Sequence, residues 1–133
     1  MLNHVIETFN HYYRKKITKK TATVSLVAIT SPDLELSVKT FLNIDKSRLN
    51  KILIFDFYPE KKIGDKFREM NYDVVDIPRK SIYEVYKNVL EKTQDDYIVI
   101  FSLNGSQDPF EISGITSHLL LGYDMIIASR FMP

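Results

Sequence analysis

The chain has 133 residues, 44% of them apolar, and a formal net charge of +1 at neutral pH. This length corresponds to one domain with enough apolar side chains for a hydrophobic core. The absence of cysteine excludes disulfide bonds and thiolate metal sites, and the near-neutral charge gives no indication of nucleic-acid binding. No apolar run approaches the roughly 18 residues of a transmembrane helix, and no signal-peptide pattern opens the chain. We therefore expect a cytoplasmic protein.

The first 20 residues predict a basic amphipathic helix as a separate segment. Helical spacing places six apolar residues on one face: Val5, Ile6, Phe9, Tyr12, Tyr13 and Ile17. Five basic residues lie in the second half of this segment, against a single acidic residue in the first. We expect the helix to pack on its own domain or on a second copy in a homodimer. The alternative is a peripheral contact with an anionic membrane surface.

Residues 21–133 predict one domain in which strands and helices alternate. Runs of β-branched and apolar residues predict strands at 23–29, 51–57, 72–78, 97–101 and 123–129. Helical spacing and capping residues predict helices beginning at Ser31–Pro32, near Ile63, at Ser81 and at Asp108–Pro109. Gly122 is expected to end the last of these helices.

This alternation predicts an α/β fold, a doubly wound and mostly parallel sheet with strand order 3-2-1-4-5 and helices on both faces. In such sheets, ligands bind at the carboxyl ends of the strands where the strand order reverses, here between the first and fourth strands. The switch point places Thr30, Ser31 and the loop 102–108 around one crevice. Asp56, at the end of the second strand, is expected beside it.

Four segments around this crevice share a pattern. The first strand and its loop read VSLVAITSPD, with Val24, Ser25, Val27, Thr30 and Asp33 at the informative positions. The second strand ends at Asp56, and the fourth runs into SLNGSQDP, which contains Gly105, Asp108 and Pro109. The last segment reads GYDMIIASRFMP and includes Arg130. Together these segments resemble glycosyltransferase family 2, especially its dolichol-phosphate mannosyltransferase and glucosyltransferase branch.

The resemblance covers roughly residues 22–133. It implies the nucleotide-binding half of a Rossmann-like, A-type glycosyltransferase fold. The implied ligand is a UDP- or GDP-linked sugar, and the implied parent activity is transfer of that sugar to a lipid phosphate or a glycan. The nucleotide-binding residues implied by the matched positions are Thr30, Asp33, Asp56, Ser102, Asn104, Gly105 and Arg130.

The chain departs from the family at its metal site. Ser102 and Asn104 replace the two acids of the family's D-x-D motif, which hold Mg²⁺ or Mn²⁺ against the diphosphate. The metal offsets charge that develops on the pyrophosphate leaving group, and Mg²⁺ is typically held by one or two carboxylates plus substrate phosphates. With neutral oxygens in their place, Mg²⁺ or Mn²⁺ should bind weakly. Asn104 and Asp108 remain as weak candidate ligands.

A second departure is length, because family members continue beyond SRFMP into the half that carries the acceptor site and the usual catalytic base. We therefore expect a truncated or naturally short form, in which the catalytic residues are unknown and activity of these residues alone is doubtful.

Several of these candidate site residues can also be explained by a purely structural role. Asp108 and the pair Thr30 and Ser31 can serve as helix caps, Asp56 as a satisfied turn residue, and Arg130 as a solvated or salt-bridged side chain.

Two other functions remain open at this stage. One is a non-catalytic relative that acts as a binding or dimerisation module after losing the acidic pair. The other is a receiver-like domain phosphorylated at Asp56. The second is disfavoured because only Asp33 stands where an acidic pair is needed, and because Arg130 replaces the required lysine.

Overall fold

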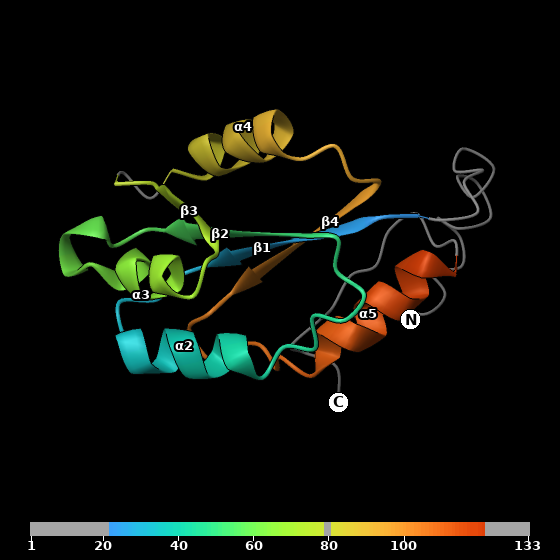
Figure 1. The fold of residues 1–133 in the computed structure, drawn as a ribbon, viewed down its shortest axis with the longest axis horizontal. Coiled ribbons are helices and arrows are strands. Elements are labelled where there is room, and N and C mark those ends of the chain that lie inside the picture. Colours follow the sequence, from blue (N-terminus) through green and yellow to red (C-terminus); the bar gives the residue numbers. More distant parts are fainter. Residues whose placement is uncertain (1–21, 79–80, 122–133) are drawn as a thin grey trace.

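The computed structural model describes residues 22–78 and 81–121 (Figure 1). The strands are β1 (Val24–Ile29), β2 (Lys51–Asp56), β3 (Asp73–Asp76) and β4 (Tyr97–Ser102). The helices are α2 (Leu34–Leu42), α3 (Ile63–Glu69), α4 (Ile82–Lys92) and α5 (Glu111–Leu120), with a short 3₁₀ helix at Pro59–Lys61. The amphipathic helix expected over residues 1–20, the strand expected at 123–129, Gly122 and Arg130 lie outside the described residues.

The four described strands form one parallel sheet in the order β3-β2-β1-β4. This confirms the α/β class and the predicted order for these strands. The described sheet has four strands rather than the five expected, because the predicted fifth falls in residues 122–133. The third strand is also shorter than predicted, covering Asp73–Asp76 instead of 72–78.

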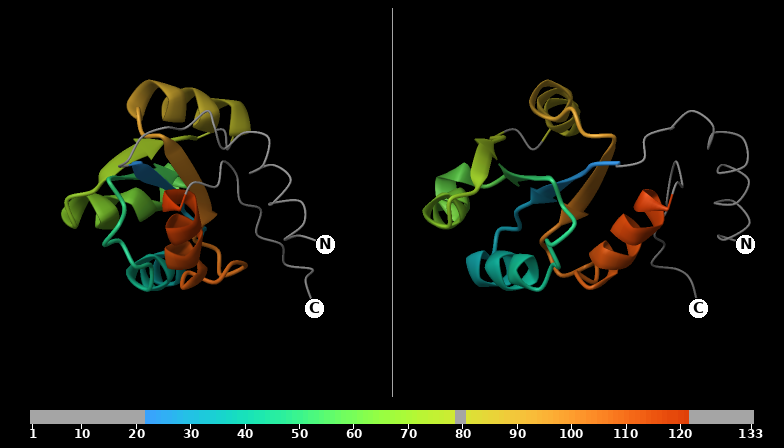
Figure 2. Two further views of the ribbon diagram at one scale, coloured as in Figure 1. Left: turned by 90° about the vertical axis from the view of Figure 1, so that its right-hand side faces the viewer. Right: turned by 45° about the vertical axis from the view of Figure 1, so that its right-hand side comes forward.

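Helices cover both faces of the sheet, as predicted (Figures 1 and 2). On one face, Phe41 of α2, Phe67 of α3 and Ile112 of α5 are buried in one cluster with alternate residues of β1. On the other face, Val85 and Val89 of α4 pack against β1 and β2. Because β1 is covered on both sides, its residues are buried almost throughout.

Aromatic contacts fix α2 against α3 and the strand that follows. The Phe41 ring meets the Phe67 ring edge-on at 5.2 Å and the Tyr72 ring at 4.9 Å between centroids. Such pairs contribute about 0.5–1.5 kcal/mol each beyond the burial of their area. They hold α2 at the position from which its first turn faces the switch point.

The start of α2 differs from the prediction. Ser31 and Pro32 were expected to begin the helix, but its N-cap is Asp33, whose carboxylate accepts a hydrogen bond from the Leu36 amide at 3.1 Å. The Ser31 amide instead donates to the Ser37 hydroxyl at 3.0 Å, and the two hydroxyls lie 2.8 Å apart. Ser31 is therefore buried inside the loop. At Ser81 the predicted cap is confirmed, because its hydroxyl accepts from the Glu84 amide.

Acidic residues tie the amino ends of the strands together. The Asp96 carboxylate accepts from the Thr23 amide at 3.0 Å, while Asp95 accepts from the Ser25 hydroxyl and from the Asn50 side-chain amide. Partial burial raises the pKa of the Asp95 carboxyl, but these side-chain hydrogen bonds outweigh it. The net effect is a pKa below the ordinary value.

Candidate functional site

The candidate site lies where β1 and β4 end side by side. Ile29 pairs with Ser102 in the register of the two strands, and the Leu103 amide donates to the Ile29 carbonyl at 2.8 Å. Beyond this point the chain leaves β1 toward α2 and leaves β4 toward α5. Loops 30–33 and 103–110 therefore diverge from a common origin, as the switch-point argument predicted.

Farther out, the loop after β4 approaches the first turn of α2. Gly105 has a left-handed backbone with φ of 79°, which glycine adopts without strain. A Cβ atom at this position would lie 3.5 Å from Cδ1 of Leu36, in the first turn of α2. The structure thus brings Thr30, Asp33 and the loop containing Asn104 and Gly105 to one edge of the sheet.

Asp56 is the most buried of the predicted site residues, with 1% of its surface exposed. Its Oδ1 accepts from the Thr30 hydroxyl at 3.0 Å and from the Tyr58 amide at 2.9 Å. Its Oδ2 accepts from the Gly64 amide at 2.8 Å. The Thr30 hydroxyl in turn accepts from the Phe57 amide at 3.1 Å. This carboxylate therefore joins the ends of β1 and β2 to the first turn of α3.

Gly64 allows the start of α3 to lie close to the Asp56 carboxylate. A Cβ atom there would lie 2.8 Å from Asp56 Oδ2 and 2.8 Å from Cγ1 of Val74. The sequence analysis did not single out Gly64. The only signal for it was a glycine at the start of a helix that follows a strand-terminal acid.

The loop after β4 is organised by its own side chains. The Asn104 side-chain oxygen accepts from the Ser106 amide at 2.9 Å, and the Gln107 side-chain oxygen accepts from the Ser102 amide at 3.1 Å. Asp108 accepts from the Phe110 amide at 2.9 Å. The N-cap role expected of Asp108 is wrong, because α5 begins later than predicted, at Glu111, with Phe110 as its N-cap and no side-chain cap hydrogen bond. Asp108 instead closes the turn that precedes the helix. Gln107 was not identified from the sequence.

The donor set at this loop fits a divalent cation poorly. It contains one carboxylate, Asp108, and the neutral oxygens of Ser102 and Asn104, and both Asp108 and Asn104 already accept backbone N–H groups. Mg²⁺ is ordinarily held by one or two carboxylates together with substrate phosphates. Within residues 22–78 and 81–121, no three histidine or acidic side chains come together as a metal-binding group.

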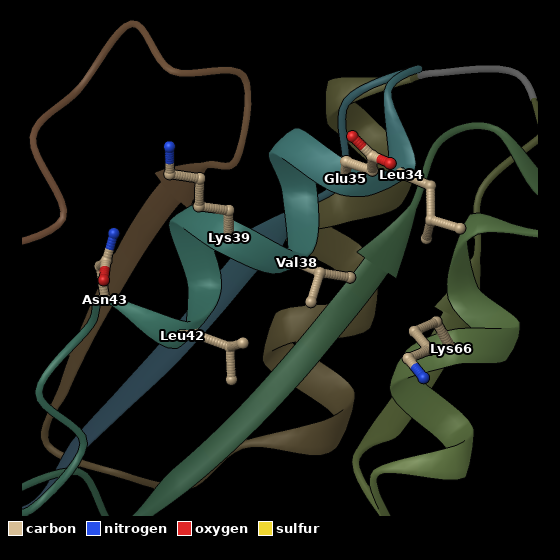
Figure 3. A pocket seen from close by; sticks show the side chains of 7 residues that line it. All are labelled: Leu34, Glu35, Val38, Lys39, Leu42, Asn43 and Lys66. Atoms are coloured by element: carbon tan, nitrogen blue, oxygen red, sulfur yellow. The ribbon is translucent and has the colours of Figure 1, made fainter.

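A separate apolar groove lies on the outer side of α2 (Figure 3). Leu34, Val38 and Leu42 follow one another along the helix and line it, and Lys66 of α3 lies across from them. Its volume is about 460 Å³. Since its lining comes from α2 and α3 without the loop after β4, this groove is distinct from the switch-point site.

The structure shows a parallel α/β sheet flanked by helices, which is consistent with the predicted Rossmann-like class. Comparison with protein-family models, with curated protein sequences and with solved structures gave no match. Across the described part of the chain, no helix has the length and apolar character needed to cross a membrane.

Proposed function

We propose that this chain is a glycosyltransferase-like domain that binds the nucleotide part of a UDP- or GDP-linked sugar at the switch point. The observation that carries the proposal is that loops 30–33 and 102–108 begin side by side at the carboxyl ends of adjacent parallel strands. These are the loops in which the family-like motifs lie. The parent activity is transfer of the sugar to a lipid phosphate or glycan.

The charges at the site favour the nucleoside over the diphosphate. Asp33 and Glu35 lie at the start of α2, and Asp108 and Glu111 lie at the start of α5. These acids oppose the attraction that helix N-termini exert on phosphate groups. Without a strong metal site to offset them, we expect weak binding that depends mainly on hydrogen bonds to the base and ribose.

A second candidate is a non-catalytic module of the same fold. It is favoured by the engagement of Asp56, whose two carboxylate oxygens are buried and hydrogen-bonded to neighbouring groups of the chain itself. Residues that serve as internal braces persist through packing alone, without a ligand. The two candidates differ in whether the switch point binds a nucleotide at all.

Calorimetric titration of the full chain with UDP, GDP and their sugars, with and without Mn²⁺, separates them. The informative variant is Ser102→Asp with Asn104→Asp, which restores the acidic pair. If the loop has the geometry of a donor site, this variant should gain Mn²⁺-dependent affinity of about tenfold or more, equivalent to roughly 1.4 kcal/mol. The matched control is Ser47→Asp with Gln94→Asp, which adds the same charge at exposed positions outside the loop after β4.

The native chain should bind one of the nucleotides with an affinity that changes little on adding Mn²⁺. Absence of binding at millimolar nucleotide by both the folded native chain and the acidic variant would refute the nucleotide-binding proposal. It would leave the interaction module as the function to pursue.

A further inference from the structure

The sheet face covered by α4 has an exposed apolar region next to that helix. It consists of Ile98 and Ile100 on β4 and of Tyr83, Tyr86 and Leu90 on α4. We call these five residues the α4–β4 surface. Large apolar side chains exposed together in this way are uncommon on a monomeric protein and usually mark a contact.

The strand register shows that Ile98 and Ile100 belong to the α4 face. Ile100 pairs with Val27 of β1, and paired residues of neighbouring strands point to the same side of a sheet. Val27 is fully buried in the cluster that contains Val85 and Val89 of α4. The helix therefore covers β1 and β2, and it leaves the adjacent strand β4 partly open on this side.

The α4 part of the surface lies on the flank that faces β4. Glu84 and Asn88 line a cavity with Val75 and Ile77 of β3 and its loop, so that flank of the helix faces β3. With 3.6 residues per turn, Tyr86 and Leu90 fall on the opposite flank, beyond the buried Val85 and Val89. The exposed residues of α4 and β4 thus border the same uncovered strip of sheet.

We propose that residues 5–17 dock on the α4–β4 surface through their apolar face. The chain enters the described fold at the edge of this surface. The Thr23 amide donates to Asp96 at 3.0 Å, and the Tyr97 amide donates to the Thr23 carbonyl at 3.0 Å. Residue 22 therefore lies at the amino end of β4, and the segment that precedes it begins beside the strip that it would cover.

The lengths match. Thirteen residues in a helix span about 20 Å, and the six residues of β4 also span about 20 Å. Residues 18–21 can bridge roughly 13 Å, enough to turn the segment back onto the sheet face. Covalent attachment also raises the effective concentration of the segment at the surface to the millimolar range.

The side chains of the segment complement those of the α4–β4 surface and of the acidic residues at its edge. The segment offers a stripe of aliphatic and aromatic side chains to an apolar strip of the same character. Basic residues at the end of the segment and in the linker, between Arg14 and Lys20, come last before the fold, where the Asp95 and Asp96 carboxylates stand. A second copy or an anionic lipid surface would also accept apolar residues, but neither is held next to the strip by the chain itself.

Thiol labelling of the full chain tests this docking, because the native sequence has no cysteine. Leu90→Cys places a thiol within the α4–β4 surface. The Leu90 side chain is 78% exposed in the described structure, so the substitution should not disturb the core. Leu42→Cys, on α2 in the opposite helix layer, is the reference position and is 60% exposed. Each variant is also made with Phe9→Ser and Tyr13→Ser, or with the polar-face control Glu7→Gln and His11→Ser.

Docking should make the thiol at position 90 react about tenfold more slowly than the thiol at position 42. Phe9→Ser with Tyr13→Ser should remove that difference, and the polar-face control should leave it unchanged. Equal rates at the two positions, or slow labelling at position 90 that ignores the Phe9 and Tyr13 changes, would overturn the proposal. Protection that rises with protein concentration together with a doubled mass would instead assign the surface to a second copy. Protection that requires phosphatidylserine vesicles would assign it to a lipid surface.

Discussion

Replacing Asp56 with asparagine tests the brace that joins β1, β2 and α3. The asparagine side chain has the same shape but only one acceptor oxygen. In its best orientation it keeps the contacts of Oδ1 with Thr30 and Tyr58 and turns its NH₂ group toward the Gly64 amide. Two donors then face each other in a site that is 1% exposed.

The expected loss follows from these contacts. A hydrogen bond to a charged group contributes about 1.5–3 kcal/mol, and a buried donor left without an acceptor costs about 1–3 kcal/mol. We therefore expect Asp56→Asn to lower the free energy of unfolding by about 3 kcal/mol. For a domain of this size that corresponds to a decrease in Tm on the order of 10 °C.

Urea denaturation of the full chain, followed by circular dichroism, measures this change. Asp33→Asn is the matched control, because it makes the same chemical change at an exposed N-cap where asparagine and aspartate are about equally effective. The control should lose less than about 1 kcal/mol, mainly from the lost charge at the helix N-terminus. A loss below about 0.5 kcal/mol for Asp56→Asn, with an unchanged m-value, would refute the brace.

Two further substitutions probe the contacts around this framework. Gly64→Ala should destabilise by about 1–3 kcal/mol in the same assay, because its Cβ would overlap Asp56 Oδ2. Gly114→Ala places its Cβ where no other atom is near, so this change should instead stabilise the fold by up to about 1 kcal/mol. Equal effects of the two changes would contradict this reasoning. Since hydrogen bonds hold the pKa of Asp95 below 3.8, its contribution to stability is present above that pH and is lost as the pH falls below it. Asp95→Asn should therefore weaken the decline of the urea midpoint at low pH, and an unchanged decline would exclude this role.

The strand order could be predicted from the sequence because its signals are local and repeated. Apolar strands separated by helical stretches dictate a parallel sheet with short right-handed connections. The predicted order is the usual one of a doubly wound sheet, and the structure confirms it for β3, β2, β1 and β4. The same local reasoning identified the helices and the cap at Ser81.

The start of α2 could not be predicted in the same way. Ser31 and Asp33 are both good cap residues, and only the tertiary structure decides between them. Ser31 is engaged by Ser37, about one turn into α2, and this leaves Asp33 to accept from Leu36. Sequence patterns do not show which of two adjacent polar side chains finds a partner farther along the chain.

Asp56 shows the same limit at the candidate site. From the sequence it was equally a nucleotide contact and a turn residue, because both roles place an acid at the end of a strand. What distinguishes them is the position of the Gly64 amide, set by how α3 packs on the sheet. That position depends on contacts of Phe67 with α2 that no motif records.

The hydrogen bonds also rank the predicted site residues by how readily they could meet a ligand. Asp56 is 1% exposed, so a nucleotide can reach its carboxylate only if the surrounding brace opens, and each backbone N–H group left unpaired would cost about 1–3 kcal/mol. Asn104 is exposed, and water or a ligand can replace its contact with Ser106 with little net change. Binding at the switch point should therefore involve the loop after β4 and leave the Asp56 brace in place. This is why the acidic-pair variant in that loop tests the function, whereas Asp56→Asn tests the fold.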